Sequence, residues 1–224
     1  MPNRPSVVAV DVNETLSDLS PMAAQFEEVG APAALAKLWF ASLLRDGFAL
    51  TAAGASQPFS QVDVDVGVLR TVLAHQQLDR DLDQAVEHVM SGFSELPVHP
   101  DVPEGVRALK EAGLRLVTLT NGSTAVGEQL FARAGLDGAF EMLLSVEDAG
   151  AWKPHPTSYA YAADRCGVPA EETLLVAVHP WDTDGAARAG LSTAWISRDN
   201  GDYPLHFRRP RSEDAGRPRA SRPR

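Results

Sequence analysis

The stretch VVAVDVNETLSDL, from Val7 to Leu19, joins a short apolar run to a carboxylate. Residues 7–10 are apolar and mostly β-branched, which predicts a buried strand. The run ends at Asp11, and Asn13 and Thr15 follow closely. Taken alone, Asp11 is best interpreted as a turn or helix-capping residue. An acid at the carboxyl end of a parallel strand, however, occupies the place where functional groups of α/β proteins gather.

The composition indicates a globular protein of one large domain, or of a core with a smaller appendage. The chain has 224 residues, 44% of them apolar and 22% charged. Its net charge of −10 argues against a general nucleic-acid surface. We expect no membrane span and no signal peptide, because no apolar run is long enough and the N-terminal residues MPNRPS form no apolar h-region. The one cysteine, Cys166, fits a reducing compartment and is expected to be a structural thiol, so we expect a cytoplasmic protein without membrane partners.

The second half of the chain alternates between strand and helix patterns. Repeated units of this kind predict a parallel sheet with helices on both faces, that is, an α/β Rossmann-like core. The predicted helices span residues 104–113, 125–135, 158–167 and 184–190, and the predicted strands span residues 114–120, 140–146, 172–178 and 192–197.

A helical segment interrupts this core after the first strand. Residues 22–30, 34–50, 66–78 and 82–96 all have helical patterns without a strand between them. We therefore predict a core domain of residues 1–16 and 98–206 and a helical cap domain of residues 17–97. Residues 207–224 carry seven Arg against two acids and have no apolar periodicity, so we predict a disordered, solvated tail.

Polar residues follow four of the predicted strands. Asp11 ends the first strand, Thr120 and Asn121 end the second, Lys153 follows the third, and His179 and Asp182 follow the fourth. The carboxyl ends of parallel strands meet at one edge of a sheet. A lysine and hydrogen-bond donors beside a carboxylate would keep it ionised, so that it could attack as a nucleophile.

The order of these segments resembles the four motifs of the haloacid dehalogenase superfamily. The segments are DxNxTL, TNGS, KP and HPWD, and TLTNGS, KPHPTSY and HPWDTDGA most resemble the L-2-haloacid (type II) dehalogenases. The resemblance implies a helical cap, an aspartate nucleophile and hydrolysis of short 2-halocarboxylic acids to 2-hydroxy acids through an aspartyl ester. It gives catalytic roles to Asp11, Thr15, Thr120, Asn121, Lys153 and Asp182. In this interpretation Lys153 holds Asp11 as an anion, and Asp182 orients Lys153 and the hydrolytic water.

The substrate-binding candidates are Asn13, Phe40, Arg45, Tyr159, His179 and Trp181. Several of these depart from the family pattern. Phe40 occupies the place of the arginine expected in the cap, and Arg45 is the nearest substitute. His179 occupies the place of an Asn, where it could act as a general base or as a neutral hydrogen-bonding residue.

Two other functions remain open on the sequence alone. Most members of the superfamily are Mg²⁺-dependent phosphatases, which use a second acid two residues after the nucleophile. Here that residue is Asn13, and Ala177 stands where the first acid of the fourth motif would be. We therefore expect no required metal or other cofactor, although Mg²⁺ would be needed if the phosphatase alternative held. The third possibility is a non-catalytic binding protein, and relatives are commonly homodimers.

Overall fold

A parallel sheet organises the core domain. The computed structural model describes residues 5–55, 61–199, 201–210 and 212–213. Its sheet has six strands in the order β3-β2-β1-β4-β5-β6, and every neighbouring pair is parallel. The strands are β1 (Val7–Val10), β2 (Arg115–Thr120), β3 (Met142–Ser145), β4 (Thr173–Ala177), β5 (Ser192–Trp195) and β6 (Ser212–Glu213). This arrangement confirms the predicted α/β fold class.

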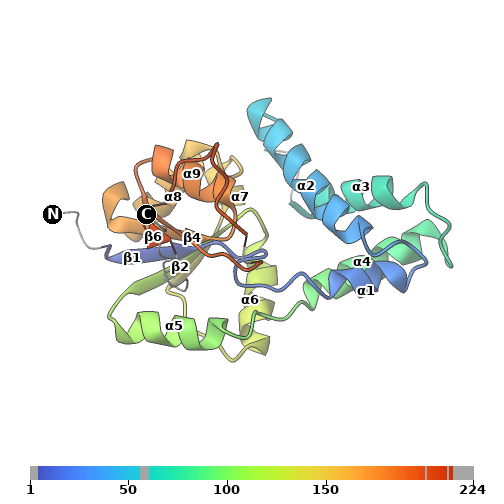
Figure 1. Cartoon of the computed structure of the whole chain (residues 1–224), viewed down its shortest axis with the longest axis horizontal. Coiled ribbons are helices and arrows are strands. Elements are labelled where there is room, and N and C mark those ends of the chain that lie inside the picture. The colour runs from blue at the N-terminus through green and yellow to red at the C-terminus, as the bar shows by residue number, and fades with distance from the viewer. Residues whose placement is uncertain (1–4, 56–60, 200, 211, 214–224) are drawn as a thin grey trace, which may run out of the picture.

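Successive side chains of β1 point to opposite faces of the sheet, and helices cover both faces. Val8 and Val10 pack in a cluster with residues of α5 (Val102–Glu111) and α6 (Thr124–Arg133). Val7 and Ala9 point into the opposite cluster, which includes residues of α8 (Pro156–Cys166) and α9 (Pro180–Arg188). Since all four β1 residues are buried, β1 forms the centre of the core (Figure 1).

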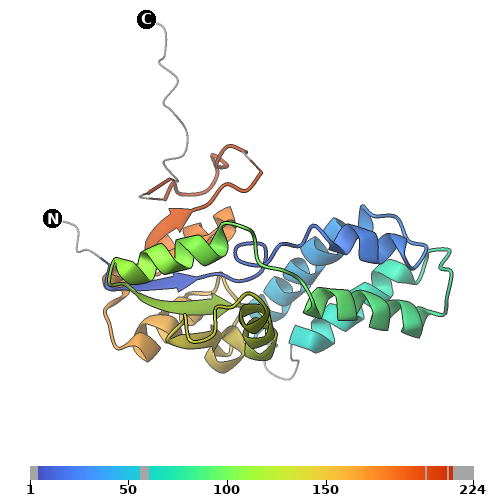
Figure 2. The ribbon, with the colours of Figure 1, turned by 90° about the horizontal axis from the view of Figure 1, so that it is seen from below.

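The described residues of the inserted segment form four helices. These helices lie beside the strand ends (Figures 1 and 2). Trp39 is fully buried among them and meets Phe93 edge-on at 5.2 Å. Its indole N–H donates to the backbone oxygen of Asp65 at 3.1 Å. Ser17 and Val98 form an antiparallel bridge where the chain leaves and re-enters the core, next to the proposed domain boundaries. The helices are α1 (Met22–Glu27), α2 (Leu35–Ala52), α3 (Gln61–Leu73) and α4 (Leu82–Ser94).

One helix of the cap, α2, contacts the loop that carries Lys153. A Cβ atom added to Gly47 would lie only 2.2 Å from the ring of Trp152, so the helix can approach this closely only through glycine. The backbone N–H of Trp152 donates to the Thr51 hydroxyl at 3.1 Å. One turn of α2 is therefore fixed against the loop directly before the lysine.

Several elements differ from the sequence-based predictions. The predicted helix 184–190 begins earlier, at Pro180, because proline suits the first turn of a helix. The predicted strand 140–146 is shorter and runs into a short helix, α7 (Val146–Ala149), capped by the Ser145 hydroxyl. A 3-10 turn, η1 (Ala170–Glu172), precedes β4 and was not predicted.

The prediction of a disordered tail over residues 207–224 is wrong at its start. Residues 207–210 are described, and β6 (Ser212–Glu213) pairs with β5 through Ala194 and Trp195. The backbone N–H of Arg208 donates to Asp184 at 3.1 Å. The remainder of the predicted tail, 214–224, lies outside the described residues. No helix among the described residues has the length and hydropathy needed to span a membrane.

We predict that Gly47→Ala destabilises the protein because the added methyl group would displace the buried Trp152 ring. The free energy of unfolding should fall by about 1 to 3 kcal/mol, as in other overpacked sites. Gly67→Ala is the matched control, since Gly67 lies in α3 and its added Cβ would meet no atom within 4 Å. That variant should gain about 0.5 to 1 kcal/mol from helix propensity. Urea denaturation measures both changes, and equal stabilisation of the two variants would contradict the prediction.

Candidate active site

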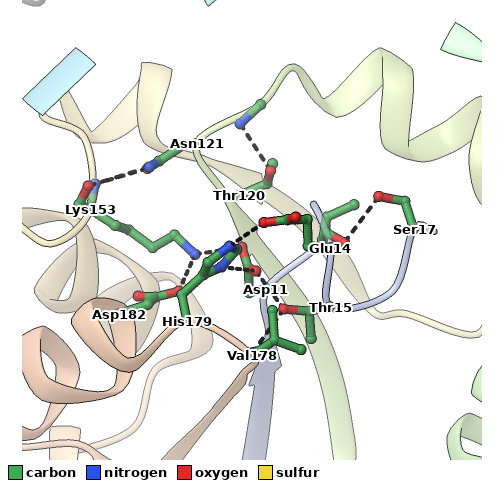
Figure 3. A network of polar contacts seen from close by, with 12 residues as sticks. Asp11, Glu14, Thr15, Ser17, Thr120, Asn121, Lys153, Val178, His179 and Asp182 are labelled. Atoms are coloured by element: carbon green, nitrogen blue, oxygen red, sulfur yellow. Dashed lines mark hydrogen bonds and ion pairs between the residues drawn. The ribbon is translucent and has the colours of Figure 1, made fainter. Parts of the chain in front are cut away.

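Asp11 lies at the centre of a buried polar cluster at the carboxyl ends of the strands (Figure 3). Its Oδ1 accepts a hydrogen bond from Lys153 Nζ at 2.8 Å, and its Oδ2 accepts one from the Thr15 hydroxyl at 2.6 Å. Burial alone would raise the pKa of Asp11, but Lys153 and His179 outweigh burial and hold that pKa well below its usual value. Asp11 is therefore an anion at neutral pH.

Lys153 bridges two buried carboxylates. Its Nζ lies 2.8 Å from Asp11 Oδ1 and 2.6 Å from Asp182 Oδ2, and its side chain is 0% exposed. Burial acts to lower the pKa of Lys153, whereas the two carboxylates raise it above the ordinary value and prevail. The ammonium group therefore remains charged and neutralises one of the two acids.

The side chain of Asn121 holds the backbone of Lys153 in place. Its Oδ1 accepts from the Lys153 N–H at 2.9 Å, and its Nδ2 donates to the Lys153 carbonyl at 3.3 Å. Both ends of the amide are thus engaged on one residue. Thr120 is the last residue of β2, and its hydroxyl accepts from the Gly122 N–H at 2.9 Å. Asn121 therefore positions Lys153, and Thr120 shapes the turn.

Tyr159 holds the Asp182 oxygen that Lys153 does not contact. The fully buried Tyr159 hydroxyl donates to Asp182 Oδ1 at 2.7 Å, so both carboxylate oxygens of Asp182 are engaged. A Cβ on Gly185 would lie 2.7 Å from that hydroxyl, which explains why the next turn of α9 has glycine there. Burial raises the pKa of Asp182, and repulsion from Asp11 adds to the effect. Tyr159 contacts Asp182 deep in the core, which differs from its predicted place among substrate-binding residues.

Thr15 connects two strand ends. Its hydroxyl donates to Asp11 and accepts from the Val178 N–H at 3.1 Å, just beyond β4. The loop after β1 is held further by Arg198, which donates twice to the Thr15 carbonyl, at 2.7 and 3.1 Å. These bonds fix Asp11 relative to β4 and α9.

His179 brings a second cationic group to Asp11. Its Nδ1 lies 3.3 Å from Asp11 Oδ2, and its Nε2 lies 2.8 Å from Glu14 Oε2. Burial alone would lower the pKa of His179, but the hydrogen bonds to these two carboxylates raise it to about 9. The ring stacks with Trp181 at 4.9 Å and with Phe40 of the cap at 6.4 Å.

The structure does not bring every predicted residue to this cluster. The Arg45 side chain is 69% exposed and pairs with Asp46 at 2.8 Å on the surface of α2. Arg45 therefore lies away from the cluster in this structure, and Phe40 and Phe48 occupy the face of α2 that meets His179 and Trp181. Asn13 lines a neighbouring cavity of about 170 Å³ together with Thr120, Val12, Met90, Phe93 and Val126.

Sequence reasoning missed Glu14 as a site residue. Glu14 has φ 60°, a left-handed conformation that costs a non-glycine residue about 1 to 2 kcal/mol. A position that suits glycine but holds a carboxylate is a signal for function, although φ is not visible in a sequence. Trp152 was also missed, because only the fold shows that it receives α2.

The donor set fits a bound divalent cation poorly. Among the described residues, no three His, Cys, Asp or Glu side chains are grouped so as to hold a metal ion. The ammonium of Lys153 also occupies the space between Asp11 and Asp182, the two acids best placed to be ligands.

Comparisons with known proteins agree with this geometry. A family model for haloacid dehalogenase-like hydrolases matches residues 5–190. An (S)-2-haloacid dehalogenase of Pseudomonas putida is 31% identical over 198 residues, which cover 88% of this chain and 86% of that protein.

Solved structures of dehalogenases are also similar. One L-2-haloacid dehalogenase superposes with a TM-score of 0.87 at 30% identity and covers 94% of each chain. The L-2-haloacid dehalogenase of Xanthobacter autotrophicus, solved with chloropropionic acid covalently bound, superposes with a TM-score of 0.77 at 26% identity, covering 87% of this chain and 78% of that one. The chain therefore belongs to the haloacid dehalogenase-like hydrolases and is of the L-2-haloacid dehalogenase type.

Proposed function

We propose that the protein hydrolyses short 2-halocarboxylic acids to 2-hydroxy acids and halide through an ester on Asp11. The observation that carries the proposal is the ionised Asp11 carboxylate, held by Lys153 at 2.8 Å at the carboxyl end of β1. The likeness to a dehalogenase that holds chloropropionic acid covalently supports the same chemistry.

In the first step an Asp11 oxygen attacks the α-carbon of the substrate, and the carbon–halogen bond breaks. Lys153 and Thr15 keep Asp11 ionised and fix its orientation, so the attacking oxygen is positioned before the substrate binds. Halide leaves as a stable anion and needs no proton, which is consistent with an amide rather than an acid at Asn13.

In the second step water attacks the acyl carbon of the Asp11 ester. The bond from that carbon to the substrate oxygen breaks, which releases the 2-hydroxy acid and restores the carboxylate. Asp182 and Asn121 hold Lys153 in position throughout, one through its ammonium and the other through its backbone. The aromatic side chains of Phe40 and Trp181 stack on the ring of His179.

Asp11→Asn should abolish halide release from (S)-2-chloropropionate, because a neutral amide cannot act as the nucleophile. We expect a loss of at least about 10³-fold in kcat, measured as chloride produced, with and without Mg²⁺. The far-UV circular dichroism spectrum should stay that of the wild type. Chloride release by the variant at the wild-type rate would refute the role of Asp11.

A single turnover in H₂¹⁸O should place the label on Asp11, since water adds to the acyl carbon and one of its oxygens stays in the carboxylate. Mass spectrometry of the peptide that contains Asp11 measures this incorporation. Label found in the 2-hydroxy acid but not in the peptide would mean that water attacks the α-carbon directly.

Arg45→Ala should leave KM and kcat for 2-chloropropionate within about twofold of the wild type, because an exposed ion pair such as Arg45–Asp46 contributes little. Steady-state halide release measures both constants. A KM raised tenfold or more would show that the helix α2 reorients on substrate binding and brings Arg45 to the carboxylate.

A further inference from the structure

His179 is the imidazole that contacts the reacting carboxylate. Figure 3 shows dashed lines from its ring to the Asp11 and Glu14 side chains. Nδ1 lies 3.3 Å from Asp11 Oδ2, and Nε2 lies 2.8 Å from Glu14 Oε2. The two ring nitrogens therefore face two different carboxylates. Only one of these carboxylates, Asp11, changes its charge during the proposed reaction.

Glu14 contacts the ring from a strained backbone conformation. The residue adopts φ 60°, and from there its carboxylate accepts a hydrogen bond from His179 Nε2. Backbone strain of this kind persists where surrounding interactions fix it and is common in active sites. A proton held on Nε2 leaves Nδ1, the nitrogen that faces Asp11, free to gain or lose a proton.

The position of the ring is fixed by aromatic contacts rather than by further polar bonds. Trp181 stacks on it at 4.9 Å with an interplanar angle of 29°, and Phe40 of α2 lies at 6.4 Å with an angle of 28°. The His179 side chain is 12% exposed, compared with 5% for Asp11 and 0% for Lys153. Of these three side chains, His179 is the most accessible to solvent water.

Asp182 is poorly arranged to accept a proton from water. Its Oδ2 accepts from Lys153 Nζ at 2.6 Å, its Oδ1 accepts from the Tyr159 hydroxyl at 2.7 Å, and its side chain is 0% exposed. Because the side chain is fully buried, neither oxygen of Asp182 is in contact with solvent. Asp182 therefore orients Lys153, and a side chain closer to solvent is better placed to take the proton.

We propose that His179 is the general base for hydrolysis of the Asp11 ester, and that Glu14 is the positioning residue that keeps the proton of the neutral ring on Nε2. This inference rests on the proposed function, because it concerns the second half of that reaction.

The protons balance as follows. When Asp11 becomes an ester, the imidazolium loses its Nδ1 proton to solvent, so one proton and one halide leave together. Nδ1 then takes a proton from the attacking water and passes it to the substrate oxygen as the bond from that oxygen to the acyl carbon breaks. The remaining hydroxyl proton on the Asp11 carboxyl group moves to Nδ1, which restores the carboxylate and the imidazolium.

The change in charge on Asp11 controls this sequence. Among the described residues, the charged side chains in contact with the ring are Asp11 and Glu14, both from the segment after β1, whereas α2 and α9 present Phe40 and Trp181. With both carboxylates ionised, the pKa of His179 is raised to about 9. Ester formation removes the Asp11 charge and therefore lowers the pKa of His179, so the ring becomes neutral when a base is needed.

Rapid-quench kinetics with (S)-2-chloropropionate test the proposal. Wild type, His179→Gln and Glu14→Gln are mixed with excess substrate, and chloride and the ester-bearing Asp11 peptide are measured over time. His179→Gln should release one chloride per active site and then turn over about 10²- to 10⁴-fold more slowly than the wild type, with the ester accumulating. Glu14→Gln should slow the same step by less. His75→Gln, which changes an exposed histidine of the cap, is the matched control and should behave as the wild type.

The pH dependence distinguishes a base from a residue that only shapes the loop. In the wild type the rate of ester decay should rise with pH and level off once His179 is neutral. In His179→Gln that rate should be nearly independent of pH over the same range. If His179→Gln does not fold, the slower ester decay of Glu14→Gln tests the His179–Glu14 pair instead. The Glu14 side chain is 42% exposed in the wild type, so this position tolerates substitution.

Two results would overturn the inference alone. One is ester decay in His179→Gln with the rate and pH profile of the wild type. The other is a His179→Gln variant that releases no first chloride and forms no ester, which would place His179 in the first step. A wild type that releases no chloride from any short 2-halo acid would instead refute the proposed function itself, and the inference with it.

Discussion

The site depends on one ammonium group that is shared by two buried carboxylates. An unpaired charge of this kind costs several kcal/mol when it leaves water, so Asp11 and Asp182 could not both stay ionised in the core without Lys153. The distances of 2.8 and 2.6 Å place Nζ against one oxygen of each acid. His179 supplies a second positive charge at the other carboxylate oxygen of Asp11, so that two anions meet two cations within the buried cluster.

The parallel sheet explains why these residues meet although they are distant in sequence. Val10 pairs with Thr118 on one side and with Val176 on the other, so the ends of β2 and β4 flank Asp11. Asn121 then places Lys153, and Pro180 starts α9 so that Asp182 falls within its first turn. The cap completes the site through α2, whose Gly47 and Phe48 contact Trp152 and Trp181.

Much of this arrangement could be predicted because it follows from patterns along the chain. The alternation of strand and helix gave the parallel core, and residues just after the strands gave Asp11, Asn121, Lys153 and Asp182 as neighbours. The direction of Arg45 could not be predicted, because it depends on the rotation of α2 about its axis, which the contact with Trp152 sets. The pairing of Glu14 with His179 depends on one backbone angle, and the strand β6 depends on an edge of β5 that exists only in the folded sheet.

The same geometry accounts for the amide at Asn13 under the proposed function. A leaving group that departs as a stable anion needs no acid beside it. The side chain two residues after Asp11 therefore does not have to donate a proton, and an amide is sufficient there. The proton that must move belongs to water, and it moves only after Asp11 has lost its charge. A base for that step is most useful if it is protonated while Asp11 is an anion and neutral while Asp11 is an ester. An imidazole that is hydrogen-bonded to Asp11 itself meets both conditions, because the carboxylate that stabilises its charge is the group consumed in the first step.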